Sequence, residues 1–237
     1  MKTFIQILVL GILFLSIDAF APIPSQTSCH HHQTMTRQQL ASKRGEDETA
    51  RPKLVIFDLD GCLWRPEMYE LVHFMGNKGA PFRPSEHDRN VLLTVGNEPV
   101  QLLKDVREVM KELFLDPQWK DVTVGISSRT DAPHWARELL TKFSVRHDSG
   151  EFVLDDLFRG PVEISYESKV KHFRRISKDT GIAFEDMIFL DNEYGNCASV
   201  ADLGVTVGYC PGGVCKGIWQ KTLDAFSASR QGTVVEL

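Results

Sequence analysis

An apolar run that ends in two carboxylates is the feature of this sequence that most constrains its fold. Residues 54–57, Leu-Val-Ile-Phe, are all apolar, and Asp58 and Asp60 follow directly, before Gly61. A continuous, non-alternating apolar run predicts a strand that is covered on both faces, as in a parallel sheet. The two carboxylates therefore mark the end of a core strand, and Gly61 permits the chain to leave strand geometry there.

The same kind of strand is predicted at several other places along the chain. Three further apolar runs rich in β-branched residues occupy residues 122–126, 187–190 and 205–209. Between the runs, apolar residues recur at helical spacing over 98–114, 132–143 and 167–181, and the last of these segments ends at a glycine. Alternating strands and helices predict an α/β fold with a doubly wound, Rossmann-like parallel sheet, in which ligands bind at the carboxyl ends of the strands.

Polar side chains of a particular kind follow the predicted strands or open a predicted helix. The set comprises Asp58, Asp60, Ser128, Arg129, Lys169, Asp191 and Asn192. Each of these residues alone has an ordinary structural explanation, as a helix cap, a turn former or a solvated lysine. Together they supply oxygen ligands for Mg²⁺ and cations for a phosphate, and they predict one site at one edge of the sheet.

Several motifs resemble those of one known superfamily. The segment DLDGC resembles the first motif of the haloacid dehalogenase superfamily, with Ser128, Lys169 and Asp191-Asn192 as its second, third and fourth motifs. More narrowly, FDLDGCLW, SSRTD, SKVKHF and DMIFLDNEYGN resemble the magnesium-dependent phosphatase-1 family over most of residues 53–207. Two positions depart from that family, because Gly61-Cys62 replaces Tyr-Thr and Asn192 replaces an aspartate. The related carboxy-terminal-domain phosphatases are similar in using an Asp-Asn pair with Mg²⁺.

The resemblance implies a phosphatase that works through an aspartyl-phosphate. Asp58 would be the nucleophile and Asp60 the general acid and base. Ser128 and Lys169 would hold the phosphoryl oxygens, and Arg129 is a further candidate contact for phosphate or substrate. Mg²⁺ is the implied cofactor, and its implied ligands are Asp58, Asp60 through its backbone carbonyl, Asp191 and Asn192.

The resemblance leaves the substrate open. A small phosphorylated metabolite, such as a sugar phosphate or a glycated-amine phosphate, is the leading expectation. The alternatives are a protein phosphotyrosine, which an open site would admit, and a catalytically silent binding domain that retains the fold. Residues 64–97 contain several Pro and Gly residues, so we expect a loop or small hairpin there, no large cap domain, and an open site. Trp64, His73 and His87 are candidates to line it.

The first fifty residues are typical of a targeting segment. Residues 1–19 have one lysine, an apolar stretch too short to span a membrane comfortably, and Ala19 before a plausible cleavage point, so they predict a signal peptide. Residues 20–50 begin at Phe20 and lack acidic side chains up to residue 45, as expected of a disordered transit peptide. This pair predicts delivery to the plastid of a secondary-plastid alga. Secretion or an endomembrane lumen is the alternative.

Composition excludes several other classes of protein. The chain has 237 residues and a formal net charge of −5, with no basic stripe, so nucleic acid is not an expected partner. Its five cysteines are odd in number and scattered, which argues against a disulfide framework, and Cys210 with Cys215 is too little for a zinc site. Residues 51–237 are expected to form one phosphatase domain, without stable membrane association after processing.

Overall fold

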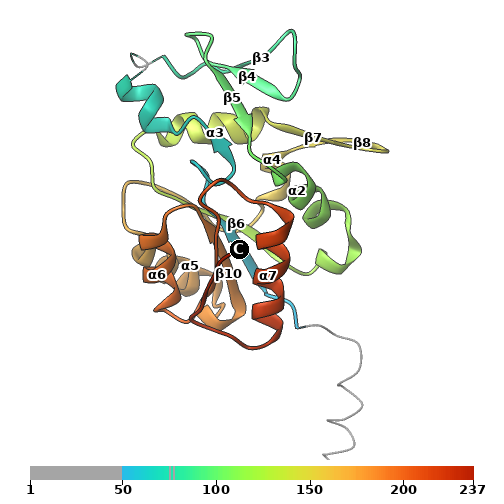
Figure 1. Cartoon of the computed structure of the whole chain (residues 1–237), viewed down its shortest axis with the longest axis vertical. Coiled ribbons are helices and arrows are strands. Elements are labelled where there is room, and N and C mark those ends of the chain that lie inside the picture. The colour runs from blue at the N-terminus through green and yellow to red at the C-terminus, as the bar shows by residue number, and fades with distance from the viewer. Residues whose placement is uncertain (1–49, 75, 77) are drawn as a thin grey trace, which may run out of the picture. The chain divides into compact units, whose positions relative to one another are not determined.

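A computed structural model describes residues 50–74, 76 and 78–237 (Figure 1). The predicted signal peptide, and the predicted transit peptide up to residue 49, lie outside the described residues. Within the described part, no helix combines the length and apolar character that crossing a membrane requires.

Six parallel strands form the central sheet, in the order β12-β11-β10-β1-β6-β9. Their bounds are β1 Leu54–Phe57, β6 Thr123–Ser128, β9 Val162–Ile164, β10 Met187–Asp191, β11 Thr206–Tyr209 and β12 Val234–Val235. All four residues of β1 are fully buried, as the continuous apolar run predicted. Because β1 lies between β10 and β6, the polar residues that end these three strands are brought to one edge.

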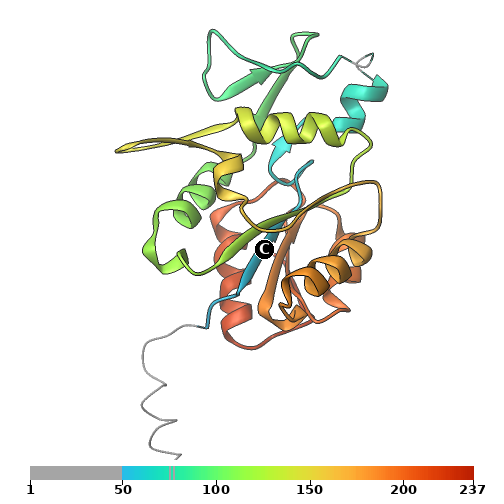
Figure 2. The ribbon, with the colours of Figure 1, turned by 180° about the vertical axis from the view of Figure 1, so that it is seen from behind.

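Helices cover both faces of this sheet (Figures 1 and 2). The helices are α2 Val106–Leu115, α3 Pro133–Lys142, α4 Leu154–Leu157, α5 Lys169–Thr180, α6 Tyr194–Ala201 and α7 Lys216–Ser227, with short 3₁₀ turns at Pro117–Trp119 and Phe184–Asp186. Strand β1 contributes to two apolar clusters, because Val55 and Phe57 point to the cluster that includes α7 while Leu54 and Ile56 point to the cluster with α5 and α6. The predicted α/β fold with a doubly wound parallel sheet is therefore confirmed.

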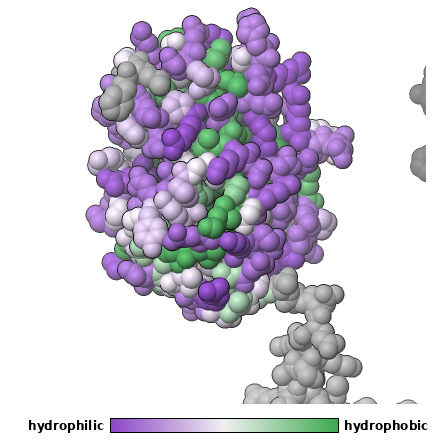
Figure 3. Space-filling view, viewed as in Figure 1, coloured by the Kyte–Doolittle hydropathy of each residue, from purple (hydrophilic) through white to green (hydrophobic). Residues whose placement is uncertain are grey.

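A second, antiparallel sheet follows β1. It has the order β2-β5-β4-β3, with β2 Trp64–Arg65, β3 Arg83–Pro84, β4 Val91–Leu93 and β5 Pro99–Leu102, and a π-helix at Glu70–Phe74 lies in the same segment. A separate hairpin pairs β7 Ser144–His147 with β8 Gly150–Val153. We call residues 64–102, which contain the four-stranded sheet and the π-helix, the inserted segment; it is too small to be a large cap. On the face shown in Figure 3, hydrophilic residues predominate and hydrophobic ones show between them.

The prediction of one helix over residues 98–114 was wrong at its start. Residues Pro99–Leu102 form β5, which pairs with β2 and β4, and the helix begins only at Val106. Lys104 between them has a φ of 36°, a left-handed backbone that no helix continues through. The expected loop or small hairpin at 64–97 belongs to a four-stranded antiparallel sheet that extends to Leu102. Pairing of β5 with β4 and β2 overrides the local apolar spacing.

Candidate active site

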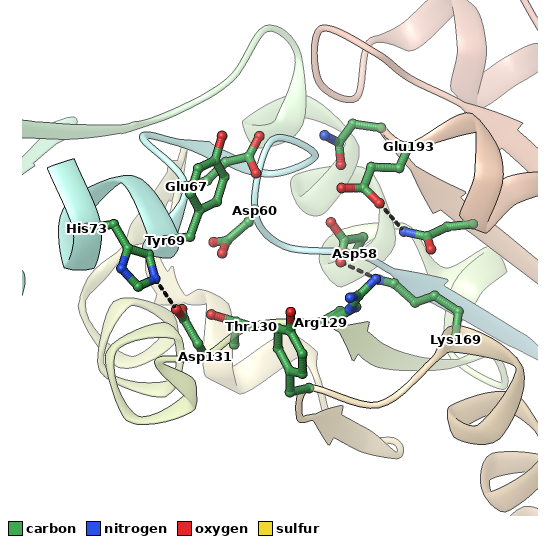
Figure 4. Close-up of a pocket in the computed structure, with 13 residues that line it drawn as sticks. Asp58, Asp60, Glu67, Tyr69, His73, Arg129, Thr130, Asp131, Lys169 and Glu193 are labelled. Atoms are coloured by element: carbon green, nitrogen blue, oxygen red, sulfur yellow. Dashed lines mark hydrogen bonds and ion pairs between the residues drawn. The ribbon is translucent and has the colours of Figure 1, made fainter.

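The carboxyl ends of β1, β6 and β10 bring three of the predicted motifs together around one lysine. Lys169 is the first residue of α5 and is almost completely buried. Its Nζ donates to an Oδ of Asp58 (Figure 4). It also donates to the backbone oxygen of Ser127 at 2.5 Å, and it lies 3.1 Å from Oδ2 of Asp191. One ammonium group is therefore shared by two buried carboxylates that are far apart in sequence.

Burial controls the charges of this cluster. It raises the pKa of Asp58 well above its usual range, although the positive charge of Lys169 opposes the shift. Burial alone would lower the pKa of Lys169, but Asp58 and Asp191 outweigh it and raise that pKa, so the ammonium stays charged. Two carboxylates against one cation leave the cluster short of positive charge, and a further cation would relieve that imbalance.

The oxygen donors of this cluster fit Mg²⁺. Asp58 and Asp191 present carboxylate oxygens, and Asn192 lines the same pocket as Asp58. Within the described residues, no three His, Cys, Asp or Glu side chains form a metal-binding group by themselves. A cation here would therefore need amide, backbone carbonyl or water oxygens to complete its shell. That is the usual way in which proteins hold Mg²⁺, and it is a poor match to zinc.

Asp60 lines the same pocket as Asp58 but is held by its own hydrogen bonds. Its Oδ1 accepts a hydrogen bond from Trp64 Nε1 at 2.8 Å, and its Oδ2 accepts one from the backbone N–H of Met68 at 3.0 Å. Burial raises the pKa of Asp60 to about 7, against the opposing effect of these two hydrogen bonds. Asp60 is thus able to give and take a proton near neutral pH. Trp64, a predicted lining residue, does not line the pocket, because it is fully buried and orients Asp60.

The second motif divides into a buried and an exposed part. Ser128 is fully buried, and its Oγ has no hydrogen-bond partner among the residues that the structure describes. A buried hydroxyl without a partner is costly, and a bound phosphoryl oxygen is the kind of partner that would satisfy it. Arg129 is exposed and lines the pocket, with its guanidinium carbon 4.8 Å from the ring centre of Tyr166.

The two positions that depart from the phosphatase-1 pattern affect different surroundings. Gly61 has a φ of 71°, and a Cβ there would lie 2.4 Å from Nδ2 of Asn192 and 2.9 Å from Oε1 of Glu67. The missing side chain at position 61 therefore makes room for Asn192 and Glu67. Cys62 lies below the site, with its Sγ 3.4 Å from the backbone oxygen of Leu190, and burial raises the pKa of its thiol well above the usual range. It is a neutral, structural thiol.

The pocket has a volume of about 360 Å³, and most residues at its rim had no predicted role. The rim residues are Glu67, Tyr69, Thr130, Asp131, Tyr166, Glu193 and Asn196, together with His73, which we had considered as a lining residue. His73 Nε2 lies 2.9 Å from Asp131 Oδ2 and joins the inserted segment to the loop after β6 (Figure 4). His87 does not line the pocket. Four of the rim residues lie within motifs quoted above: Thr130 and Asp131 in SSRTD, and Glu193 and Asn196 in DMIFLDNEYGN. Glu67 and Tyr69 lie close to the first motif, so closeness to the motifs could have indicated these residues.

The fold and this arrangement of residues define a haloacid dehalogenase-like hydrolase. The model of the acid phosphatase family matches residues 50–229. Human magnesium-dependent phosphatase 1 is 34% identical over 183 residues, which cover 76% of this chain and 90% of that protein. A HAD-like hydrolase superfamily protein of Schizosaccharomyces pombe is 33% identical over 155 residues, 65% of this chain and 83% of its own.

One solved structure illustrates how far the structural likeness extends. A haloacid dehalogenase-like family hydrolase from Xanthomonas campestris aligns with 76% of this chain and 97% of its own, at 16% identity and a TM-score of 0.49. The family assignment depends on the sequence matches, which span most of the described residues. This chain belongs to the acid phosphatase family of the haloacid dehalogenase superfamily.

Proposed function

We propose that this protein is a Mg²⁺-dependent phosphatase that hydrolyses a small phosphorylated metabolite through an aspartyl-phosphate on Asp58. The observation that carries the proposal is the buried cluster at the base of the pocket. Asp58 and Asp191 share one lysine there, and Asp60, with a pKa raised to about 7, faces the same cavity. The relationship to human magnesium-dependent phosphatase 1 supports both the reaction and the metal.

Asp58 would carry the phosphoryl group between the two chemical steps, and Asp60 would transfer a proton in each of them. In the first step an oxygen of Asp58 bonds to phosphorus, the bond to the leaving oxygen breaks, and Asp60 gives that oxygen its proton. In the second step water attacks the aspartyl-phosphate while Asp60 takes a proton from the water, which releases phosphate and restores Asp58. Asp60 must be protonated first and ionised later, and a pKa near 7 suits both states.

The remaining residues of the site would bind the phosphoryl group and its countercharge. Mg²⁺, held by Asp58, Asp191, Asn192 and the carbonyl of Asp60, would offset the repulsion between a carboxylate and a phosphate dianion. Lys169 would contact the phosphoryl oxygens from its position between the carboxylates. The hydroxyl of Ser128, which has no partner among the described residues, and the guanidinium of Arg129 would donate to the same group.

The rim of the pocket supports a polar metabolite as substrate. Glu67 and Glu193 both line the cavity and carry carboxylates that accept hydrogen bonds from hydroxyl or ammonium groups. A volume of about 360 Å³ suits a ligand of the size of a sugar phosphate or a glycated-amine phosphate. A protein phosphotyrosine is the competing substrate, because Tyr69 and Tyr166 are exposed at the same rim.

The test is turnover of p-nitrophenyl phosphate by the full chain, with Mg²⁺ and with a chelator. We expect hydrolysis that requires Mg²⁺. Absence of turnover at any Mg²⁺ concentration would overturn the proposed activity and favour a silent binding domain. A panel of sugar phosphates, glycated-amine phosphates and phosphotyrosyl peptides then decides the substrate, and preference for the peptides would overturn the metabolite proposal.

The proposed location is a plastid reached through the secretory route. The support is in the sequence, where an apolar stretch precedes Ala19 and an acid-free segment begins at Phe20. A fluorescent protein fused to residues 1–50 should enter the plastid of a secondary-plastid alga, and Phe20→Ala should stop it before the plastid. A fusion that remains in the cytosol contradicts the proposal, and a secreted one favours the alternative of a secretory or endomembrane location.

A further inference from the structure

We infer that His172 is a positioning residue, which fixes Lys169 and Ser128 for phosphoryl transfer through two serine hydroxyls. The inference rests on the proposed function, because it assigns a task within that reaction. His172 is fully buried on α5 and makes its hydrogen bonds on the side of the helix that faces the ends of β6 and β9. None of the sequence motifs assigned it a role.

The imidazole links two strands that end at the site. Its Nδ1 lies 3.1 Å from Oγ of Ser127, at the end of β6, and its Nε2 lies 2.9 Å from Oγ of Ser165, which follows β9. A neutral imidazole has one donor and one acceptor nitrogen, so one serine donates to the ring and the other accepts from it. Both ring nitrogens of the fully buried imidazole are thereby satisfied.

Each serine is in turn bonded to a residue of the proposed machinery. The backbone oxygen of Ser127 accepts the hydrogen bond from Lys169 Nζ at 2.5 Å. The backbone N–H of Ser165 donates to the backbone oxygen of Ser128 at 3.1 Å. His172 therefore connects the end of β6, at Ser127, with Ser165 after β9, which holds the backbone oxygen of Ser128. It follows Lys169 by one turn of the same helix.

The charge state of His172 is compatible with this role. Burial, together with the positive charges of Lys169 and Arg175, lowers the pKa of His172 to about 4, although Glu163 and Glu167 oppose the shift. The ring is therefore neutral under physiological conditions, and it adds no charge beside the phosphate site. A buried imidazole needs partners for both nitrogens in any role, so the positioning role depends on which residues its two serine partners contact in turn.

The experiment replaces the ring with groups that keep its volume or one of its bonds. His172→Phe keeps the ring shape and removes both hydrogen bonds. We expect kcat/KM for p-nitrophenyl phosphate to fall about 10²-fold, mainly through kcat, because a small displacement of positioning groups has effects of that size. The inhibition constant for inorganic phosphate should rise at the same time. His172→Asn, whose amide takes the place of Nδ1, keeps the bond to Ser127 and should recover part of kcat.

Ile176→Ala is the matched control, because it removes buried volume from the same helix without touching the hydrogen-bonded chain. It should lower the melting temperature but leave kcat and phosphate inhibition unchanged at temperatures at which the variant is folded. Ser127→Ala should lower kcat, and its effect should not add to that of His172→Phe, since both break one chain of bonds.

The failures of the two proposals are distinguishable. If the full chain does not hydrolyse p-nitrophenyl phosphate with Mg²⁺, the proposed function is wrong. If it does, the inference about His172 is overturned when His172→Phe has the kcat and phosphate inhibition of Ile176→Ala. Should His172→Phe fail to fold, the decision passes to His172→Asn and Ser127→Ala. Wild-type kcat in both of these variants contradicts a positioning role.

Discussion

The two walls of the pocket are built in opposite ways. One wall comes from the ends of β1 and β10, which are fully buried, and from the end of β6, where Ser127 and Ser128 are fully buried too. The other wall comes from the inserted segment, which contributes Glu67, Tyr69 and His73 to the pocket; Glu67 is half-buried, and the other two are exposed. Buried parallel strands hold the groups at the base of the pocket, whereas the loop after β2 and the π-helix shape the entrance.

This difference suggests a division between chemistry and selection. Groups that must stay within tenths of an ångström of one geometry are held by buried strands and charge-assisted bonds. Groups that contact the variable part of a substrate lie on an exposed segment, which tolerates sequence change. Changes on the sheet side should therefore alter kcat or metal use, and changes on the insert side should mainly alter KM.

The largest effect is expected for Asp58→Asn on the sheet side. An amide is not a nucleophile, so turnover of p-nitrophenyl phosphate should fall by several orders of magnitude. Thermal unfolding is measured alongside, because the change also removes a charged partner of Lys169. If the folded variant keeps more than a few per cent of wild-type kcat, the aspartyl-phosphate route is wrong. Glu67→Gln, which changes a pocket carboxylate of the inserted segment, is the matched control and should keep kcat.

Asn192 tests the metal on the same wall. A neutral amide binds a cation less strongly than a carboxylate, so Asn192→Asp should lower the Mg²⁺ concentration for half-maximal activity. Asn192→Ala should raise that concentration, by about tenfold if the effect resembles other losses around metal sites. The measurement is activity against Mg²⁺ concentration. Identical curves for wild type and both variants would place the metal away from Asn192.

Gly61 lies where the two walls of the pocket meet. Comparison with Gly181 distinguishes the cost of a left-handed backbone from the cost of crowding by a side chain. Gly61 and Gly181 have similar φ values, 71° and 69°, but a Cβ at Gly181 has nothing within 4 Å. Each change to alanine should cost about 1 to 2 kcal/mol in the free energy of unfolding, for the left-handed backbone. Only Gly61→Ala should also displace Asn192 and raise the Mg²⁺ requirement. An unchanged Mg²⁺ curve for Gly61→Ala would show that the methyl group is accommodated without moving Asn192.

The pH dependence of unfolding should report Asp60. Its folded pKa of about 7 lies above the ordinary 3.8, so the group contributes stability below pH 3.8 that is lost as the pH rises through about 7. Asp60 alone can change the free energy of unfolding by at most about 1.4 kcal/mol per pH unit. In the absence of Mg²⁺, Asp60→Asn should therefore gain stability relative to wild type as the pH rises from 5 to 8. Parallel curves over that range would mean that Asp60 titrates normally.

The smallest effect is expected for His73→Ala on the insert side. The pair of His73 with Asp131 is largely exposed, and such pairs contribute about 0 to 1 kcal/mol. Stability and kcat for p-nitrophenyl phosphate should hardly change, while KM for the physiological metabolite should shift by a small factor. A large loss of kcat in His73→Ala would contradict the division between the two walls.

The sequence by itself determined the sheet and the polar groups that gather at its edge. The four buried runs, beginning with residues 54–57, became β1, β6, β10 and β11, because continuous apolar patterns reflect burial on both faces. Asp58, Lys169 and Asp191 were placed at one edge for the same reason, since parallel strands end together. Helices α3 and α5 also lie where apolar spacing predicted them, and α5 ends at Gly181 in a left-handed conformation.

Only the tertiary structure decided how these groups are held and what surrounds them. The apolar spacing of Pro99–Leu102 favoured a helix, but this segment is a strand because it pairs with β4, just before it in the chain, and with the more distant β2. The bond from Trp64 to Asp60, the chain from Ser127 through His172 to Ser165, and the rim formed by His73 and Asp131 all depend on side chains meeting across elements. Local patterns encode burial and turns, but contacts between distant residues appear only when the sheet has brought their backbones together.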